Sequence, residues 1–155
     1  MLGVGQKFPE YTLTGVVASD PAAAFQSFSS AAQAGKWQVL FFWPKDFTFV
    51  CPTEIAAFGQ LQHEFRDRGA ALFGVSIDSE YVHLAWRREK EELRELPFPM
   101  LSDLKRELSG ALGILDAEAG VAQRATYIVD PQGIIRFVYV TDLSVGRNPA
   151  EVLRV

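Results

Sequence analysis

The sequence predicts an α/β fold in which a central mixed sheet carries helices on both faces. Two apolar runs, 37–43 (WQVLFFW) and 70–77 (AALFGVSI), have the length and composition of strands that are buried on both sides. The segment 51–68 between them is long enough for a helix, so the three segments predict a right-handed crossover between two parallel strands. Further along, the turn sequence DPQG at 130–133 separates two β-rich segments, 125–129 and 134–140, and predicts an antiparallel hairpin.

The remaining segments are assigned in chain order. Apolar residues alternate within 1–14, which predicts a short peripheral strand or hairpin that extends the fold at its N-terminus. The Ala- and Ser-rich segment 20–35 is interpreted as a surface helix or an irregular insertion. A helix is expected over 80–93, a shorter one from Ser102 to Leu112, and the start of a last one from Pro149.

Two features of these helices are expected to be structural only. The charged residues 87–92 are of mixed sign, so they predict a solvated helix face. The two histidines, His63 and His83, both fall within predicted helices and are expected to be surface or packing residues. A metal site would need further ligands that converge on them.

Composition limits the classes of function. A chain of 155 residues with 48% hydrophobic content predicts one globular domain, 1–155. The net charge of −4, without a Lys/Arg cluster, disfavours nucleic acid and anionic membranes as partners. No run approaches the ~20 apolar residues of a membrane-spanning helix, and no leader pattern is seen, so we expect a cytoplasmic protein. A single cysteine fits a reducing compartment and still permits a bond between chains.

Cys51, the one cysteine, lies at a predicted helix start. It precedes Pro52, which favours the first helical position, so Cys51 is expected to be the N-cap and Glu54 to reach back to it. A lone cysteine is more often an inert core residue. Here the sulfur would instead lie at the carboxyl end of a parallel strand, facing the positive end of a helix dipole, and both features favour a reactive thiolate.

Two further residues have both a functional and a structural interpretation. Thr48 lies three residues before Cys51, so its hydroxyl could contact a ligand at the sulfur or satisfy local backbone. Arg124 precedes a hydrophobic strand, where a solvated role and a functional role are equally open.

These residues also form a recognisable motif. Pro44, Thr48 and Cys51 reproduce the Pro-x-x-x-Thr-x-x-Cys motif of the peroxiredoxins. The longer string WPKDFTFVCPTEIAAF resembles the alkyl hydroperoxide reductase C branch, also called typical two-cysteine, in its actinobacterial form. The resemblance covers roughly residues 3–155 and continues in four downstream segments: 74–79, 96–103, 124–130 and 146–148.

The resemblance implies a thioredoxin-like fold and a thiol-dependent peroxidase without a cofactor. Its substrates would be hydrogen peroxide and organic hydroperoxides, reduced by a Cys51 thiolate that becomes a sulfenic acid, in antioxidant defence. Arg124 is identified with the arginine of the family's site, which stabilises the thiolate and donates to the peroxide oxygens. The Thr48 hydroxyl would complete the donors, and Pro44 would shield the sulfur. In a supporting layer, Glu54 and Arg147 would orient Arg124.

The resemblance also implies partners. The family's second cysteine lies on a C-terminal tail that this chain lacks, so either the chain is truncated, which we expect, or an external thiol resolves the sulfenic acid. The reductant would be a thioredoxin-like protein or an alkyl hydroperoxide reductase partner, and homodimers formed through the hairpin edge strand would assemble into rings. The preferred peroxide, the physiological reductant and the oligomer size stay open.

Three other functions compete with this interpretation. A disulfide reductase is disfavoured, because no second cysteine forms a Cys-x-x-Cys pair. A thioredoxin-like holdase stays open. A redox sensor that passes its oxidation to a partner protein also stays open, because its first chemical step is the same.

Overall fold

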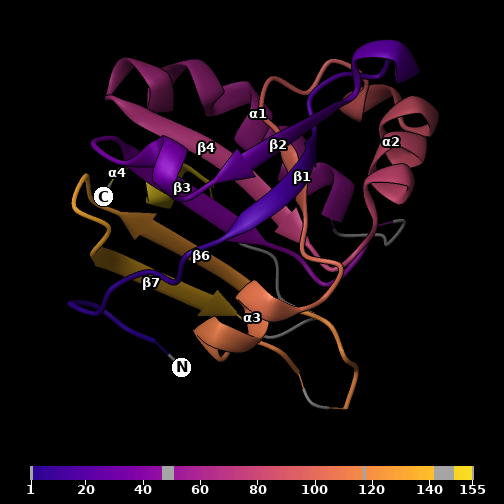
Figure 1. The fold of residues 1–155 in the computed structure, drawn as a ribbon. Helices are drawn as coiled ribbons and strands as arrows, with labels where there is room; N and C mark the ends of the chain where they lie inside the picture. Colours follow the sequence, from indigo (N-terminus) through magenta and orange to yellow (C-terminus); the bar gives the residue numbers. More distant parts are fainter. Residues whose placement is uncertain (1, 47–50, 117, 142–148, 155) are drawn as a thin grey trace.

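The computed structural model describes residues 2–46, 51–116, 118–141 and 149–154, and for residues 51–54, 92 and 150 it describes the backbone alone. Within this part of the chain the strands form one mixed sheet in the order β2-β1-β5-β4-β3-β6-β7 (Figure 1). Strands β3, β4 and β5 are parallel, and all other neighbours are antiparallel. The strand bounds are β1 Thr12–Val16, β2 Phe25–Ser29, β3 Trp37–Phe42, β4 Ala70–Ser76, β5 Met100–Ser102, β6 Arg124–Val129 and β7 Ile135–Thr141.

Helices cover both faces of the sheet, as predicted. The α-helices are α1 Cys51–Asp67, α2 Glu80–Glu89, α3 Glu107–Leu112 and α4 Pro149–Arg154, and three short 3₁₀ turns are η1 Pro21–Ala23, η2 Ala31–Gln33 and η3 Glu91–Leu93. Helices α1, α2 and α4 contribute to the core on one face, and α3 with the N-terminal segment contributes to the core on the other. In Figure 1, α3 lies beside the start of β6, and α2 lies at the right of the view, beyond β1. None of the described helices has the length and apolar content to cross a membrane.

Strand β3 is buried on both faces. Its side chains alternate between the two cores, so Val39 and Phe41 pack with α1 while Leu40 and Phe42 face α3. This explains why the 37–43 run is apolar at every position except Gln38 rather than alternating.

The predicted crossover and hairpin are both confirmed. β3, α1 and β4 follow one another, and β3 pairs with β4 in parallel register from Trp37 opposite Ala70. β6 and β7 pair antiparallel around the predicted turn, where Gly133 has a φ of 85°. The turn is closed by the Asp130 carboxylate, which accepts hydrogen bonds from two backbone N–H groups beyond it.

The N-terminal segment borders the start of β7. The amide of Gly5 donates to the Ile135 carbonyl at 2.9 Å, and the Ile135 amide donates to the Gln6 carbonyl at 2.9 Å. The amide of Phe8 donates to the Gly133 carbonyl at 2.9 Å. The chain then continues into β1, which forms a hairpin with β2. The strand or hairpin expected within 1–14 is therefore displaced along the chain, since β1 begins only at Thr12 and its partner strand lies at 25–29.

Two of the predicted elements are wrong. The segment 20–35, interpreted as a surface helix or an irregular insertion, contains strand β2, whose five residues all pair with β1. The helix expected from Ser102 does not start there, because Ser102 is the last residue of strand β5, which lies between β1 and β4. Helix α3 starts only at Glu107, after Arg106 in the left-handed conformation with a φ of 60°. It ends at Leu112 as predicted, with Gly113 as its C-cap.

The predicted solvated face of α2 is wrong for one residue. Helix α2 begins as expected, with the Ser79 hydroxyl accepting from the Val82 amide, and ends at Glu89 before the η3 turn. Arg87, however, is 1% exposed. It lies four residues after His83 and one after Trp86, both buried, so the helical repeat places it on the inner face.

Candidate active site

The motif that contains the cysteine follows the carboxyl end of β3. Helix α1 begins at Cys51, so the predicted helix start is confirmed, with Cys51 as its first residue rather than its N-cap. Thr48 and Arg147 lie outside the described residues, and the side chains of Cys51 and Glu54 are not described. The backbone of α1 nevertheless places the first amides and the positive end of a 17-residue helix next to Cys51.

Two of the predicted site residues are described with their side chains. Pro44 is buried directly after β3. Arg124 is 3% exposed and opens β6. In the antiparallel register Phe41 lies opposite Thr126, which puts Arg124 level with the residue after β3. Both residues therefore lie at the end of the sheet from which the chain leads into α1.

A buried polar pair beside this segment was not anticipated. His83 of α2 and Asp46 of the motif are joined by a 2.6 Å contact between Nδ1 and Oδ2, and both side chains are fully buried. The other Asp46 oxygen accepts from the Trp43 indole N–H at 2.9 Å. His83 Nε2 lies 3.0 Å from the Leu101 carbonyl, which can only accept, so Nε2 carries a proton.

The electrostatics of this pair follow from burial and proximity. Burial alone would lower the pKa of His83, but the Asp46 carboxylate, with Asp78 adding to it, raises that pKa above its usual value. Burial raises the pKa of Asp46, although His83 opposes the rise. We infer that the two residues hold one proton between them at Nδ1 and Oδ2.

Asp78 extends this network to the neighbouring strands. Its Oδ2 accepts from the Asp46 amide at 2.7 Å and from the Ser76 hydroxyl at 2.7 Å. Its backbone carbonyl accepts from the Ser102 hydroxyl. The motif is thereby tied to the carboxyl ends of β4 and β5 as well as to α2.

The network also satisfies the geometric condition for a metal site. Asp46, Asp78 and His83 each offer a ligand atom, and these atoms lie within 4.8 Å of one another. Both Asp46 oxygens, one Asp78 oxygen and both His83 nitrogens already contact protein groups, however. These contacts fit a hydrogen-bond network that orders the motif better than a metal centre.

The sequence predicted that His83 would be a surface or a packing residue; it is a packing residue, and its partner Asp46 was missed. The signal was available in the helical repeat, which puts His83 on the same face as the buried Trp86. A polar residue on a buried face requires a hydrogen-bond partner, and Asp46 is an acidic residue inside the cysteine motif.

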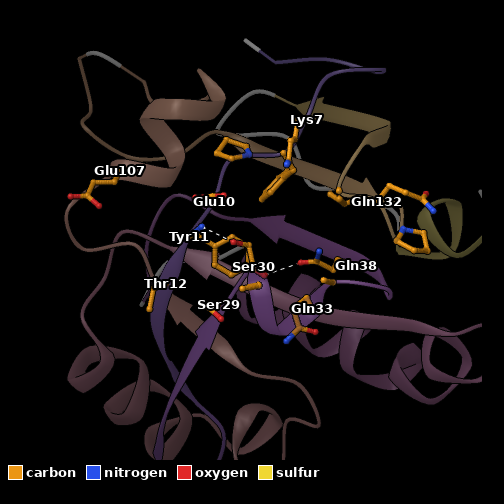
Figure 2. Close-up of a pocket in the computed structure, with 17 residues that line it drawn as sticks. Lys7, Glu10, Tyr11, Thr12, Ser29, Ser30, Gln33, Gln38, Glu107 and Gln132 are labelled. Carbon is orange, nitrogen blue, oxygen red and sulfur yellow. Dashed lines mark hydrogen bonds between the residues drawn. The ribbon is translucent and has the colours of Figure 1, made fainter.

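A hollow lies on another part of the molecule, away from the cysteine motif. It encloses about 600 Å³ and is lined mainly by polar residues, among them Lys7, Ser30 and Gln33 (Figure 2). Within it the Tyr11 hydroxyl donates to Gln38 Oε1 at 2.8 Å, and burial raises the pKa of Tyr11 so that this proton is retained. Because Gln38 is near the start of β3 and Cys51 follows its end, this hollow is not part of the cysteine site.

The fold and the site together indicate the class of protein to which this chain belongs. The model of the AhpC/TSA family matches residues 4–138, and this chain belongs to that family. Its fold is the thioredoxin-like fold of the peroxiredoxins.

Within the family the chain is similar to alkyl hydroperoxide reductase C. It is 56% identical to the enzyme of that name from Mycolicibacterium smegmatis, with 100% of this chain and 83% of the relative covered. The solved structure of Mycobacterium tuberculosis AhpC superposes with a TM-score of 0.92 at 54% identity, over 99% of this chain and 90% of that one. Peroxiredoxin-2 of Cricetulus griseus is 44% identical, with 97% of this chain and 76% of the relative covered.

Proposed function

We propose that this chain reduces hydrogen peroxide and organic hydroperoxides, with Cys51 as the nucleophile. Its family and its similarity to alkyl hydroperoxide reductase C make it a thiol-dependent peroxidase, an oxidoreductase of the peroxiredoxin class. The observation that supports Cys51 as the nucleophile is the start of α1 at this residue. Unpaired amides and the helix dipole favour the thiolate there, and the thiolate is the reactive form.

In the proposed first step the Cys51 sulfur attacks one peroxide oxygen. The S–O bond forms as the O–O bond breaks, so sulfur is oxidised to a sulfenic acid and the peroxide is reduced. The departing oxygen leaves with the bonding electron pair and takes up a proton, giving water or an alcohol. Negative charge therefore develops on the departing oxygen, where fixed hydrogen-bond donors lower the barrier.

Arg124 is proposed to supply such donors. Its guanidinium stays charged, it is buried, and the β3–β6 register puts it at the same end of the sheet as Pro44. By resemblance to the family, the Thr48 hydroxyl would be a second donor and Pro44 would exclude water from the sulfur. Glu54 and Arg147 would support Arg124 in the same way.

Regeneration requires a further thiol. Peroxiredoxins work with thiol reductants and form oligomers. A sulfenic acid condenses with a thiol, so we propose that a thioredoxin-like or alkyl hydroperoxide reductase partner protein reduces Cys51. We also propose that residues 1–155 act as one domain in the cytoplasm and that copies dimerise through the β7 edge and assemble into rings. The position of β7 at the end of the sheet supports this pairing.

Stopped-flow mixing of the reduced protein with hydrogen peroxide tests the proposal, with intact mass measured before and after. The wild type should consume peroxide rapidly and gain one oxygen atom, and C51S should do neither while keeping the same circular dichroism spectrum. Titration of the thiolate absorbance should give a Cys51 pKa below the usual thiol value of about 8.5. Peroxide consumption by C51S at the wild-type rate would refute the assignment.

A further inference from the structure

Arg87 is a buried cation that the proposed reaction does not use. Its side chain is 1% exposed, and burial lowers its pKa to about 10. No carboxylate forms an ion pair with it in the described part of the chain, where its Nε also has no hydrogen-bond partner. Removing an unneutralised charge from water costs several kcal/mol. The hydrogen bonds of the Arg87 guanidinium must therefore offset most of this cost.

The guanidinium binds backbone carbonyls from two separate segments. One nitrogen, Nη1, donates to the Val16 carbonyl at the end of β1 at 2.9 Å and lies 3.4 Å from the Phe98 carbonyl. The other, Nη2, donates to the Leu96 carbonyl at 2.7 Å. Hydrogen bonds from a charged donor are stronger than neutral ones, and the planar fork fixes both carbonyls relative to α2.

Arg87 adds to the other contacts that fix the backbone of segment 93–99. The Leu96 amide donates to the Leu93 carbonyl at 3.3 Å, and the Pro99 carbonyl accepts from the Gly74 amide at 3.1 Å. Pro97 and Pro99 have no N–H group, so the segment cannot pair there as a strand would. The Leu96 and Phe98 carbonyls alternate with these prolines and are the two carbonyls of this segment that Arg87 contacts. The side chain thus holds the part of the segment where the prolines interrupt backbone pairing.

The same segment packs tightly against the cysteine helix. At Gly59 of α1 the fit is so close that an added Cβ would lie 3.1 Å from Leu96 Cδ1 and 3.3 Å from Pro97 Cδ. The Phe98 ring meets Phe41 edge to face at 5.3 Å. Phe41 in turn stacks on Phe58 of α1 with ring centroids 4.0 Å apart. The inner face of α1 therefore rests on a surface whose backbone Arg87 fixes.

We propose that Arg87 is a positioning residue for Cys51. By clamping segment 93–99 it sets the position of α1, and with it the position of the sulfur relative to the arginine proposed to polarise the peroxide. The inference rests on the proposed function of Cys51. A displacement of about 1 Å between reacting groups can cost on the order of 10²-fold in rate, so a small shift of α1 is sufficient to be measured.

The test compares R87M, R87K and the matched control R88M. Arg88 is the next residue and is exposed, so R88M removes the same charge and fork without touching the segment. Three quantities are measured on each folded protein: the rate constant for peroxide, the apparent Cys51 pKa from its pH profile, and backbone hydrogen exchange over 52–59 and 93–99. We expect R87M to slow peroxide attack by about tenfold or more, to raise the apparent Cys51 pKa and to speed exchange in both segments. R87K should recover part of the loss, and R88M should match the wild type.

A second variant approaches the same contact from the helix. G59A leaves Arg87 intact but pushes α1 away from Leu96 and Pro97, so it should also slow peroxide attack. If R87M does not fold, G59A still tests whether the contact of α1 with segment 93–99 controls the reactivity of Cys51. Lower stability of R87M with an unchanged rate constant, pKa and exchange pattern would overturn the proposal. A wild type that does not react with peroxide would instead refute the proposed function, and the exchange data would still decide whether Arg87 holds α1.

Discussion

Replacing Asp46 by asparagine should change the pH dependence of stability far more than stability itself. The carbonyl oxygen of the new side chain can accept from the Trp43 indole N–H as the carboxylate does. The amide group of that side chain can donate to His83 Nδ1, because a neutral imidazole with its proton on Nε2 keeps the bond to the Leu101 carbonyl. Every hydrogen-bonding group retains a partner.

The expected loss of unfolding free energy distinguishes D46N from H83A and D46A. With all partners retained, D46N should lower the free energy of unfolding by only about 1 kcal/mol. H83A instead leaves the Asp46 carboxylate buried without its partner, for which about 3–5 kcal/mol is expected. D46A should resemble H83A, because it orphans the indole and the imidazole together.

The sign of the pH dependence should reverse. In the wild type the pKa of His83 is raised, so the folded state keeps a proton that the unfolded state loses above pH 6.5. The pair's stabilisation is complete below that pH and is lost as pH rises through the raised pKa, with a limiting slope of about −1.4 kcal/mol per pH unit. D46N removes the two largest effects that raise the pKa of His83, so burial, the largest effect of all, should outweigh Asp78 and the Leu101 carbonyl and lower that pKa. The folded state then binds fewer protons, and stability should fall as pH drops below 6.5.

Urea unfolding of wild type, D46N and H83A between pH 5 and 8, at one protein concentration, measures both effects. The expected result is a small loss for D46N, a large loss for H83A, and opposite slopes for wild type and D46N. If D46N were as destabilised as H83A, or kept the wild-type slope, the shared-proton description of this pair would be wrong.

Three further predictions concern the site and the core. R124A should slow peroxide attack by ~10²-fold or more, a far larger effect than its loss of stability, and an unchanged stopped-flow rate would leave Arg124 with a structural role alone. T48V should lose a smaller factor and T48S should be tolerated because it keeps the hydroxyl; equal second-order rate constants for the two variants would argue against a donor at Thr48. G74A should lower the free energy of unfolding by about 1–3 kcal/mol, because its Cβ would lie 2.6 Å from Trp43 Cζ3, whereas G110A on α3 meets nothing within 4 Å and should be neutral or slightly stabilising in the same urea experiment.

The elements that could be predicted from sequence are those with a local signal. The apolar composition of 37–43 predicts a strand that is buried on both faces. The proline after Cys51 predicts the helix start at this residue. The β6–β7 turn is closed by Asp130 within its own loop. In each case the residues that form the element also specify it.

The missed elements depend on distant partners. Strand β2 has a polar, mostly exposed sequence and exists because β1 pairs along its whole length. Strand β5 has three residues, too few for a periodic signal, and is held from both sides by β1 and β4. Sequence propensity is overridden where such pairing supplies the backbone hydrogen bonds.

The buried charges were missed for a related reason. Arg87 stands in a run of charged residues whose composition indicates a solvated face, and only its spacing from His83 and Trp86 shows otherwise. One acceptor, the Val16 carbonyl of β1, is 71 residues away along the chain, and the others belong to the segment before β5. A charge pattern read along the sequence does not show which member the helical repeat turns inward.

The contact between the N-terminal segment and β7 restricts how a second chain could be added to the sheet. Gly5 and Gln6 already occupy the backbone groups of Ile135, so a strand from another copy has only the stretch from Arg136 onward to pair with. If β7 of one copy pairs antiparallel with β7 of a second copy, the twofold axis must lie within that stretch. The N-terminal segment of each copy would then lie at one end of the paired region. The N-terminus would then act as a register stop, and its removal would let the two edges slide into alternative pairings.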